Sequence, residues 1–250
     1  MKTIVKIIVL TFILFISYLA SLLLVGLAHS QTLNHTILAL LTVSLLNTMV
    51  MSNFVILSRL SGWRLVLVVF LVFYGITTFL SQIETIVFLK YLVDIVPVDI
   101  IPKLFLQGAI IASIFSFSAV AIYGKLKDEV FQDMELLMTK KELFLKLILV
   151  AVVYTIIYFL FGMFIFVPLA GKALQEYYGN LQLPIWIIPF QMFRGLIWAT
   201  LALIVIKTMK SKWNGLTVAL LFSVLMSSLL LISNEFMPDR IRFAHFVEIA

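Results

Sequence analysis

Residues 65–93 read LVLVVFLVFYGITTFLSQIETIVFLKYLV, a nearly continuous apolar run that contains one carboxylate, Glu84. The run is longer than the roughly 20 apolar residues that an α-helix needs to cross about 30 Å of hydrocarbon. A charged side chain in such a helix costs at least ~2.5–3.5 kcal/mol on insertion scales, so an ionisable residue there marks a functional site by default. The run therefore predicts a membrane helix and a first candidate site residue.

The composition of the whole chain is that of an integral membrane protein. Of its 250 residues, 63% are hydrophobic and 12% charged, whereas a soluble domain has about 25% charged residues. No polar stretch is long enough for a separate soluble domain, so residues 1–250 are predicted to form a single transmembrane domain. The net charge of +6 lies beside apolar runs and indicates membrane topology rather than nucleic-acid binding. The chain has no cysteine, which excludes disulfides and cysteine catalysis.

Seven apolar windows are long enough to span a bilayer, which predicts an all-α fold: a polytopic transmembrane helix bundle. They lie near residues 4–27, 36–57, 65–93, 103–123, 144–168, 185–206 and 213–232. The first window is longer than the apolar core of a secretory signal, which is usually ~7–15 residues. A retained first helix is therefore favoured over a cleaved signal.

The basic residues predict the orientation of the bundle. They gather in alternate connections, at Lys2 and Lys6, Arg59 and Arg64, Lys125 to Lys141, and Lys207 to Lys212. The other connections hold only Lys103 and Lys172. Because lysine and arginine concentrate on the cytoplasmic side, the N-terminus is predicted in the cytoplasm and the C-terminus outside.

Two helices outside the membrane are also predicted. Residues 125–142 place apolar side chains on one helical face, which predicts an amphipathic cytoplasmic helix lying on the membrane surface. A partner-docking role, like that of the coupling elements of permeases that bind an ATPase, is the alternative interpretation. Residues 238–250 predict a short outer helix, since Pro238 suits a first helical turn and Asp239 suits its positive end.

A second ionisable residue, Arg194, lies in the sixth apolar window. Glu84 lies roughly 28 Å along a helix that begins near Leu65, at 1.5 Å per residue. Arg194 follows Pro189 on a helix that runs the opposite way, so both charges are expected in the outer half of the membrane. Pairing would reduce the cost of burying them, and Gln191 lies three residues before Arg194 on the same face.

Polar and small residues elsewhere in the windows predict helix packing. Ser44, Asn47, Thr48 and Ser52 form a stripe on the second helix, which is expected to bond one helix to another. Gly108, Ala112 and Ser116 recur every four residues and predict a close helix–helix contact.

The C-terminal segment adds three ionisable side chains. Arg242, His245 and Glu248 are spaced three apart and share one face of the predicted outer helix. The predicted topology puts them on the same side of the membrane as Glu84 and Arg194. They are therefore expected at the rim of one outward-facing site.

Three interpretations of this site stay open. Glu84, His245 and Glu248 could supply oxygen and nitrogen ligands to Zn or Fe, which would activate water for hydrolysis. Alternatively, the arginines clamp a carboxylate or phosphate while Glu84 and His245 handle a proton or an ammonium group. The third interpretation is a set of purely structural ion pairs.

Three short blocks resemble parts of a group of uncharacterised bacterial multi-pass inner-membrane proteins. They are Gln82-Ile83-Glu84-Thr85, Arg194-Gly195-Leu196-Ile197-Trp198, and Met237-Pro238 with Arg242, His245 and Glu248. The resemblance implies a bacterial inner-membrane location and implies no reaction.

Our leading hypothesis is a protein that binds or transports a small anionic or zwitterionic solute. Its predicted site consists of Glu84, Gln191, Arg194, Arg242, His245 and Glu248. This hypothesis needs no cofactor and does not make the protein an enzyme. The alternatives are a membrane-embedded metal-dependent hydrolase that uses Glu84, His245 and Glu248, and a non-catalytic subunit of a transport complex with a partner at residues 125–142.

Overall fold

The computed structural model describes residues 2–25, 33–92, 97–127, 138–179, 183–210, 214–233 and 236–250. Helices make up nearly all of these ranges, and the described residues contain no β-strand. The elements are α1 (Thr3–Val25), α2 (Leu33–Leu57), α3 (Gly62–Tyr74), η1 (Gly75–Phe79), α4 (Leu80–Leu92), α5 (Ile100–Ile122), α6 (Lys140–Phe161), η2 (Gly162–Phe166), α7 (Val167–Ala170), α8 (Lys172–Tyr178), α9 (Ile187–Thr208), α10 (Asn214–Ser227), η3 (Ser228–Leu231) and α11 (Asp239–Ile249). The predicted all-α class is confirmed.

Among these residues, seven helical segments are long and apolar enough to cross a membrane. They coincide with the seven predicted windows, so the chain is a multi-pass membrane protein. Two of the segments contain a π-helical stretch, η1 between α3 and α4 and η2 between α6 and α7. Single-turn π-bulges of this kind frequently lie at functional sites.

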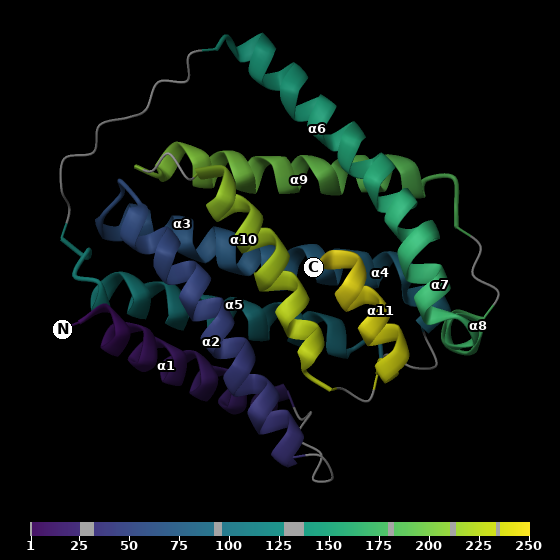
Figure 1. The fold of residues 1–250 in the computed structure, drawn as a ribbon, viewed down its shortest axis with the longest axis horizontal. Coiled ribbons are helices and arrows are strands. Elements are labelled where there is room, and N and C mark those ends of the chain that lie inside the picture. The colour runs from purple at the N-terminus through teal and green to yellow at the C-terminus, as the bar shows by residue number, and fades with distance from the viewer. Residues whose placement is uncertain are drawn as a thin grey trace.

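The helices form one bundle whose C-terminal part folds back on itself (Figure 1). On one side, α1 packs against α2 and α5, and α3 packs against α5. On the other side, α6 packs along α9, while α11 contacts η2, α7 and η3. The main hydrophobic core lies on the first side and includes the fully buried rings of Phe54, Phe73 and Phe115.

The small residues predicted to form a close helix contact do so on α5. A Cβ atom on Gly108 would collide with the side chain of Thr78 in η1. Ala112 and Ser116, one and two turns further on, are buried. Glycine at position 108 thus lets α5 approach the π-helical turn at a distance that no other residue permits.

A network of backbone hydrogen bonds joins the ends of α2, α3, α5 and α9. The Lys125 ammonium group donates to the carbonyl oxygens of Val55, Ile56 and Ser58 at 2.8, 3.1 and 2.8 Å. In addition, the Lys210 amide donates to the Leu57 carbonyl at 2.9 Å. These bonds satisfy carbonyl groups that the end of α2 leaves without intrahelical partners.

The two helices predicted outside the membrane differ from expectation. Residues 125–127 are not helical, and Lys140 to Glu142 begin α6, where Thr139 and Glu142 form a capping box. Residues 128–137, the rest of the predicted amphipathic helix, lie outside the described residues. The C-terminal helix exists as α11, but it is not a rim element. Its Ile241 and Ala244 are fully buried because α11 packs back against the bundle.

Candidate functional site

The two membrane charges form an ion pair, as their predicted depth required. The Arg194 Nη2 atom in α9 lies 2.6 Å from the Glu84 Oε2 atom in α4. The Arg194 side chain is 4% exposed and that of Glu84 is 25% exposed. The guanidinium is therefore enclosed by the bundle, whereas the carboxylate borders open space.

A tyrosine on a third helix completes this centre. The Tyr158 hydroxyl of α6 donates a hydrogen bond to Glu84 Oε1 at 3.1 Å. The helix α6 reaches this position because α9 carries Gly195 next to Arg194. A Cβ atom on Gly195 would lie 2.9 Å from the Tyr154 ring and 3.0 Å from Ala151 Cα. Glycine here allows α6 to pack directly on α9.

Buried hydrogen-bonding groups beside the ion pair have no partner among the described residues. The Nε atom of Arg194 is one of them, and both amide atoms of Gln191 are the others. The Gln191 side chain is fully buried in α9, one helical turn from Arg194. Buried polar groups are normally hydrogen-bonded, so each exception calls for an explanation such as a bound ligand.

A second polar cluster lies where α11 meets η2 and α8. The His245 Nδ1 atom lies 3.0 Å from Glu248 Oε2, and its Nε2 atom lies 3.3 Å from the Tyr178 hydroxyl. The imidazole stacks on Phe166 of η2 with ring centroids 4.2 Å apart. Burial raises the pKa of Tyr178, so its hydroxyl stays protonated and can donate a hydrogen bond.

The two clusters belong to one site. Glu84 and Glu248 both lie within electrostatic range of the Tyr158 and Tyr178 hydroxyls. The Glu248 carboxylate also approaches η2, where a Cβ atom on Gly162 would be 3.8 Å from Glu248 Oε1. We call this group the charged site, and it consists of Glu84, Tyr158, Tyr178, Gln191, Arg194, His245 and Glu248.

The remaining predicted site residue, Arg242, faces a different partner. Its Nη2 atom lies 2.7 Å from Asp239 on the same helix, while its Nη1 atom is buried without a hydrogen-bond partner in the described part of the chain. Arg240 instead donates to the Leu169 carbonyl at 3.0 Å. No contact recorded for Arg242 joins it to Glu84 or Arg194, so its role at the site stays a prediction.

The metal-binding interpretation lacks a ligand set in the described residues. No group of three histidine, aspartate or glutamate side chains there is arranged to hold a metal ion. The geometry brings His245 and Glu248 together but does not place Glu84 as their third ligand. The side chains of His29, His35 and Glu235, other ionisable groups predicted on the outer side, lie outside the described residues.

The polar stripe on α2 bonds partly across helices, as predicted. Asn47 accepts a hydrogen bond from Ser228 of η3 at 2.8 Å. Ser44, by contrast, donates to the Leu40 carbonyl of its own helix at 2.7 Å. This stripe therefore contributes one helix-to-helix bond and does not join the charged site.

Sequence reasoning missed the tyrosines of the charged site. Tyr158 and Tyr178 lie in apolar surroundings, where an aromatic residue is more often packing than recognition. A usable signal is the glycine four residues after Tyr158, because Gly162 opens η2 and leaves room for the Glu248 carboxylate. No protein-family model, curated protein or solved structure matches this chain.

Proposed function

We propose that the protein binds a small anionic or zwitterionic solute at the charged site and carries it across the membrane. The observation that supports this most is the set of unsatisfied groups around the ion pair. Arg194 has five N–H donors in a planar fork, and its Nε atom is unused within the described residues. The neighbouring Gln191 amide is equally unused.

The unused donors suit a carboxylate or phosphate group. Arginine binds such groups through two parallel hydrogen bonds, and this geometry is stronger than a single contact. Glu84 occupies only one Nη atom, so an anion could take the Nε edge without displacing the ion pair. The Gln191 amide nitrogen would then donate a further hydrogen bond to the same anion.

The carboxylates suit a positive group on the same solute. Glu84 is partly open, and Glu248 lies near the same tyrosines. An ammonium group placed between them would be stabilised by both negative charges, and the Gln191 carbonyl offers another acceptor. This arrangement favours a zwitterion such as an amino acid over a simple anion.

The location is a proposal of the same kind. The asymmetry of lysine and arginine supports an orientation with the N-terminus in the cytoplasm, and the resemblance of the three sequence blocks supports a bacterial inner membrane. In that orientation the charged site lies in the outer half of the bilayer. A solute would therefore enter from outside.

Thermal unfolding with three probes tests the binding step. Glycine, acetate and inorganic phosphate are added separately to the purified protein, because they separate a zwitterion from a carboxylate and a phosphate. A ligand at 100 times its Kd stabilises by about 2.7 kcal/mol, or roughly 5–10 °C for a chain of this size. We expect glycine to raise Tm more than acetate, and the Gln191→Leu variant to lose the shift. Absence of any shift with all three probes would refute the proposal.

A further inference from the structure

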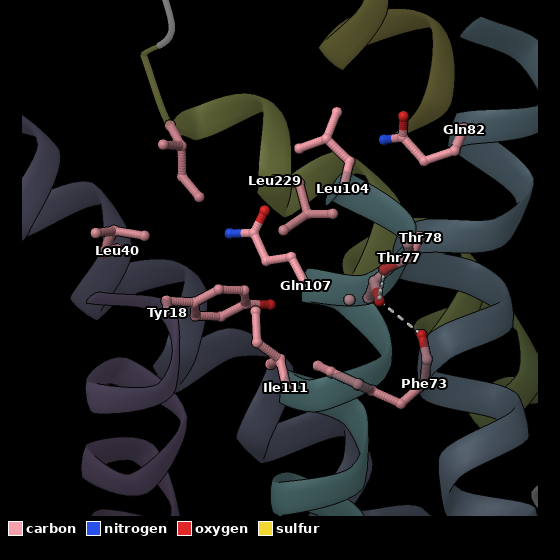
Figure 2. Close-up of a pocket in the computed structure, with 12 residues that line it drawn as sticks. Tyr18, Leu40, Phe73, Thr77, Thr78, Gln82, Leu104, Gln107, Ile111 and Leu229 are labelled. Atoms are coloured by element: carbon pink, nitrogen blue, oxygen red, sulfur yellow. Dashed lines mark hydrogen bonds between the residues drawn. The ribbon is translucent and has the colours of Figure 1, made fainter. Parts of the chain in front are cut away.

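A cavity of about 210 Å³ lies on the other side of α4 from the charged site. It is bounded by α1, α2, η1, α4, α5 and η3. Figure 2 shows the Tyr18 ring and the Gln107 side chain extending into the same space, with Thr77 and Thr78 on the opposite wall. Gln82 lines this cavity while Glu84, two residues along α4, faces Arg194. Residues two apart on a helix do not face each other, so the two sites are separate.

The lining excludes a charged ligand. No lysine, arginine, aspartate or glutamate lines the cavity, and most of its lining side chains are apolar. An ionised group placed there would be buried without a counter-charge, which is far more costly than burying an uncharged group. The occupant must therefore be uncharged over most of its length.

The polar atoms of the cavity specify one end of the ligand. The Gln82 Oε1 atom is buried and accepts no hydrogen bond from the described residues. The Gln107 amide nitrogen donates to Ser21 Oγ at 2.8 Å, which leaves its carbonyl oxygen as an acceptor. An amide carbonyl needs a donor, so the ligand should carry an O–H or N–H group.

The position of the cavity indicates how the ligand enters. All of its lining residues except Ile232 belong to segments that can cross a membrane. A ligand in such a place comes from the surrounding lipid. We infer that the cavity binds an uncharged amphiphile that has an apolar chain and a hydroxyl headgroup, as in a monoacylglycerol. This inference does not depend on the proposed solute site.

Photolabelling in phosphatidylcholine nanodiscs tests the inference. The probe is a monoacylglycerol with a diazirine in its acyl chain, and labelled peptides are mapped by mass spectrometry. The matched variants are Ile111→Phe and Ile110→Phe, because Ile111 lines the cavity and Ile110 faces outward from the same helix. We expect labelling of residues 104–111 and 77–82 in the wild type and in Ile110→Phe, and loss of that labelling in Ile111→Phe.

A second variant and a competitor test the hydroxyl contact. Gln82→Leu keeps the side-chain volume and removes the acceptor, so labelling should fall roughly two- to tenfold, the effect of one hydrogen bond. Unlabelled monoacylglycerol should compete better than the methyl ester of the same fatty acid, which has no O–H donor. Labelling that is spread over the lipid-facing surface, or that is unchanged in both Ile111→Phe and Gln82→Leu, would overturn the inference. Equal competition by the two lipids would also overturn it.

Discussion

Arg194 and Glu84 meet at 2.6 Å, yet their environments differ sharply, since the arginine side chain is 4% exposed and the glutamate side chain is 25% exposed. A purely structural ion pair has no need of this asymmetry. A binding site does, because one partner must anchor the site while the other stays accessible to a ligand. The asymmetry also makes the two single substitutions unequal.

Glu84→Gln should destabilise the protein more than Arg194→Met. The first change leaves a buried cation without its counter-charge, which costs about 3–5 kcal/mol. The second leaves a partly open carboxylate that still accepts the Tyr158 hydrogen bond, so its cost should be nearer ~1–3 kcal/mol. Unfolding both variants with SDS in mixed micelles measures the difference. Equal costs, or the reverse order, would show that exposure does not govern this pair.

Gly195→Ala should separate α6 from α9. The new Cβ would lie 3.0 Å from the Ala151 backbone, which cannot move without shifting the helix. Overpacking of this kind typically costs about 1–3 kcal/mol, and Tyr158 should lose its contact with Glu84. Gly215→Ala is the matched control, because nothing lies within 4 Å of its added Cβ. Differential scanning of the two variants should show a lowered Tm only for the first, and an equal Tm for both would contradict this packing.

Lys125→Met should weaken the junction between α2 and α5. Its ammonium group donates to three carbonyl oxygens at the end of α2. A hydrogen bond to a charged group contributes about 1.5–3 kcal/mol, so the loss should be at least about 2 kcal/mol. Lys127→Met, two residues further along, changes an exposed lysine and should leave stability within about 0.5 kcal/mol. Denaturant titration distinguishes the pair, and similar losses for both would argue against this role of Lys125.

Single-cysteine labelling should confirm the predicted orientation. The chain has no native cysteine, so each introduced thiol is the only one present. Cysteine at Val98 or Ile185, both exposed between spans, should react with a membrane-impermeant maleimide added to intact cells. Cysteine at Leu126 should react only after the membrane is permeabilised. The opposite pattern would invert the topology and place the charged site on the cytoplasmic side.

The sequence predicted the seven spans well, because length and apolarity are local properties that the bilayer selects directly. It also predicted the meeting of Glu84 and Arg194, because helix rise and chain direction place both at one depth. The fold-back of α11 could not be predicted in this way. Its sequence is polar on average, and its burial depends on contacts of Ile241 and Ala244 with distant helices. Tyr158 was missed for the same reason, since only the packing of α6 on α9 brings it to Glu84.

The most direct test removes both charges while keeping the side-chain volumes. In the double variant Glu84→Gln with Arg194→Met, no buried charge is left unpaired, so stability should return close to that of the wild type. Equilibrium dialysis with radiolabelled glycine is then compared between the two proteins. If the pair is a binding site, the folded double variant should bind glycine at least roughly tenfold more weakly, a loss of about 1.4 kcal/mol or more. If the double variant binds glycine as well as the wild type does, Glu84 and Arg194 are a structural ion pair and the proposed site is wrong.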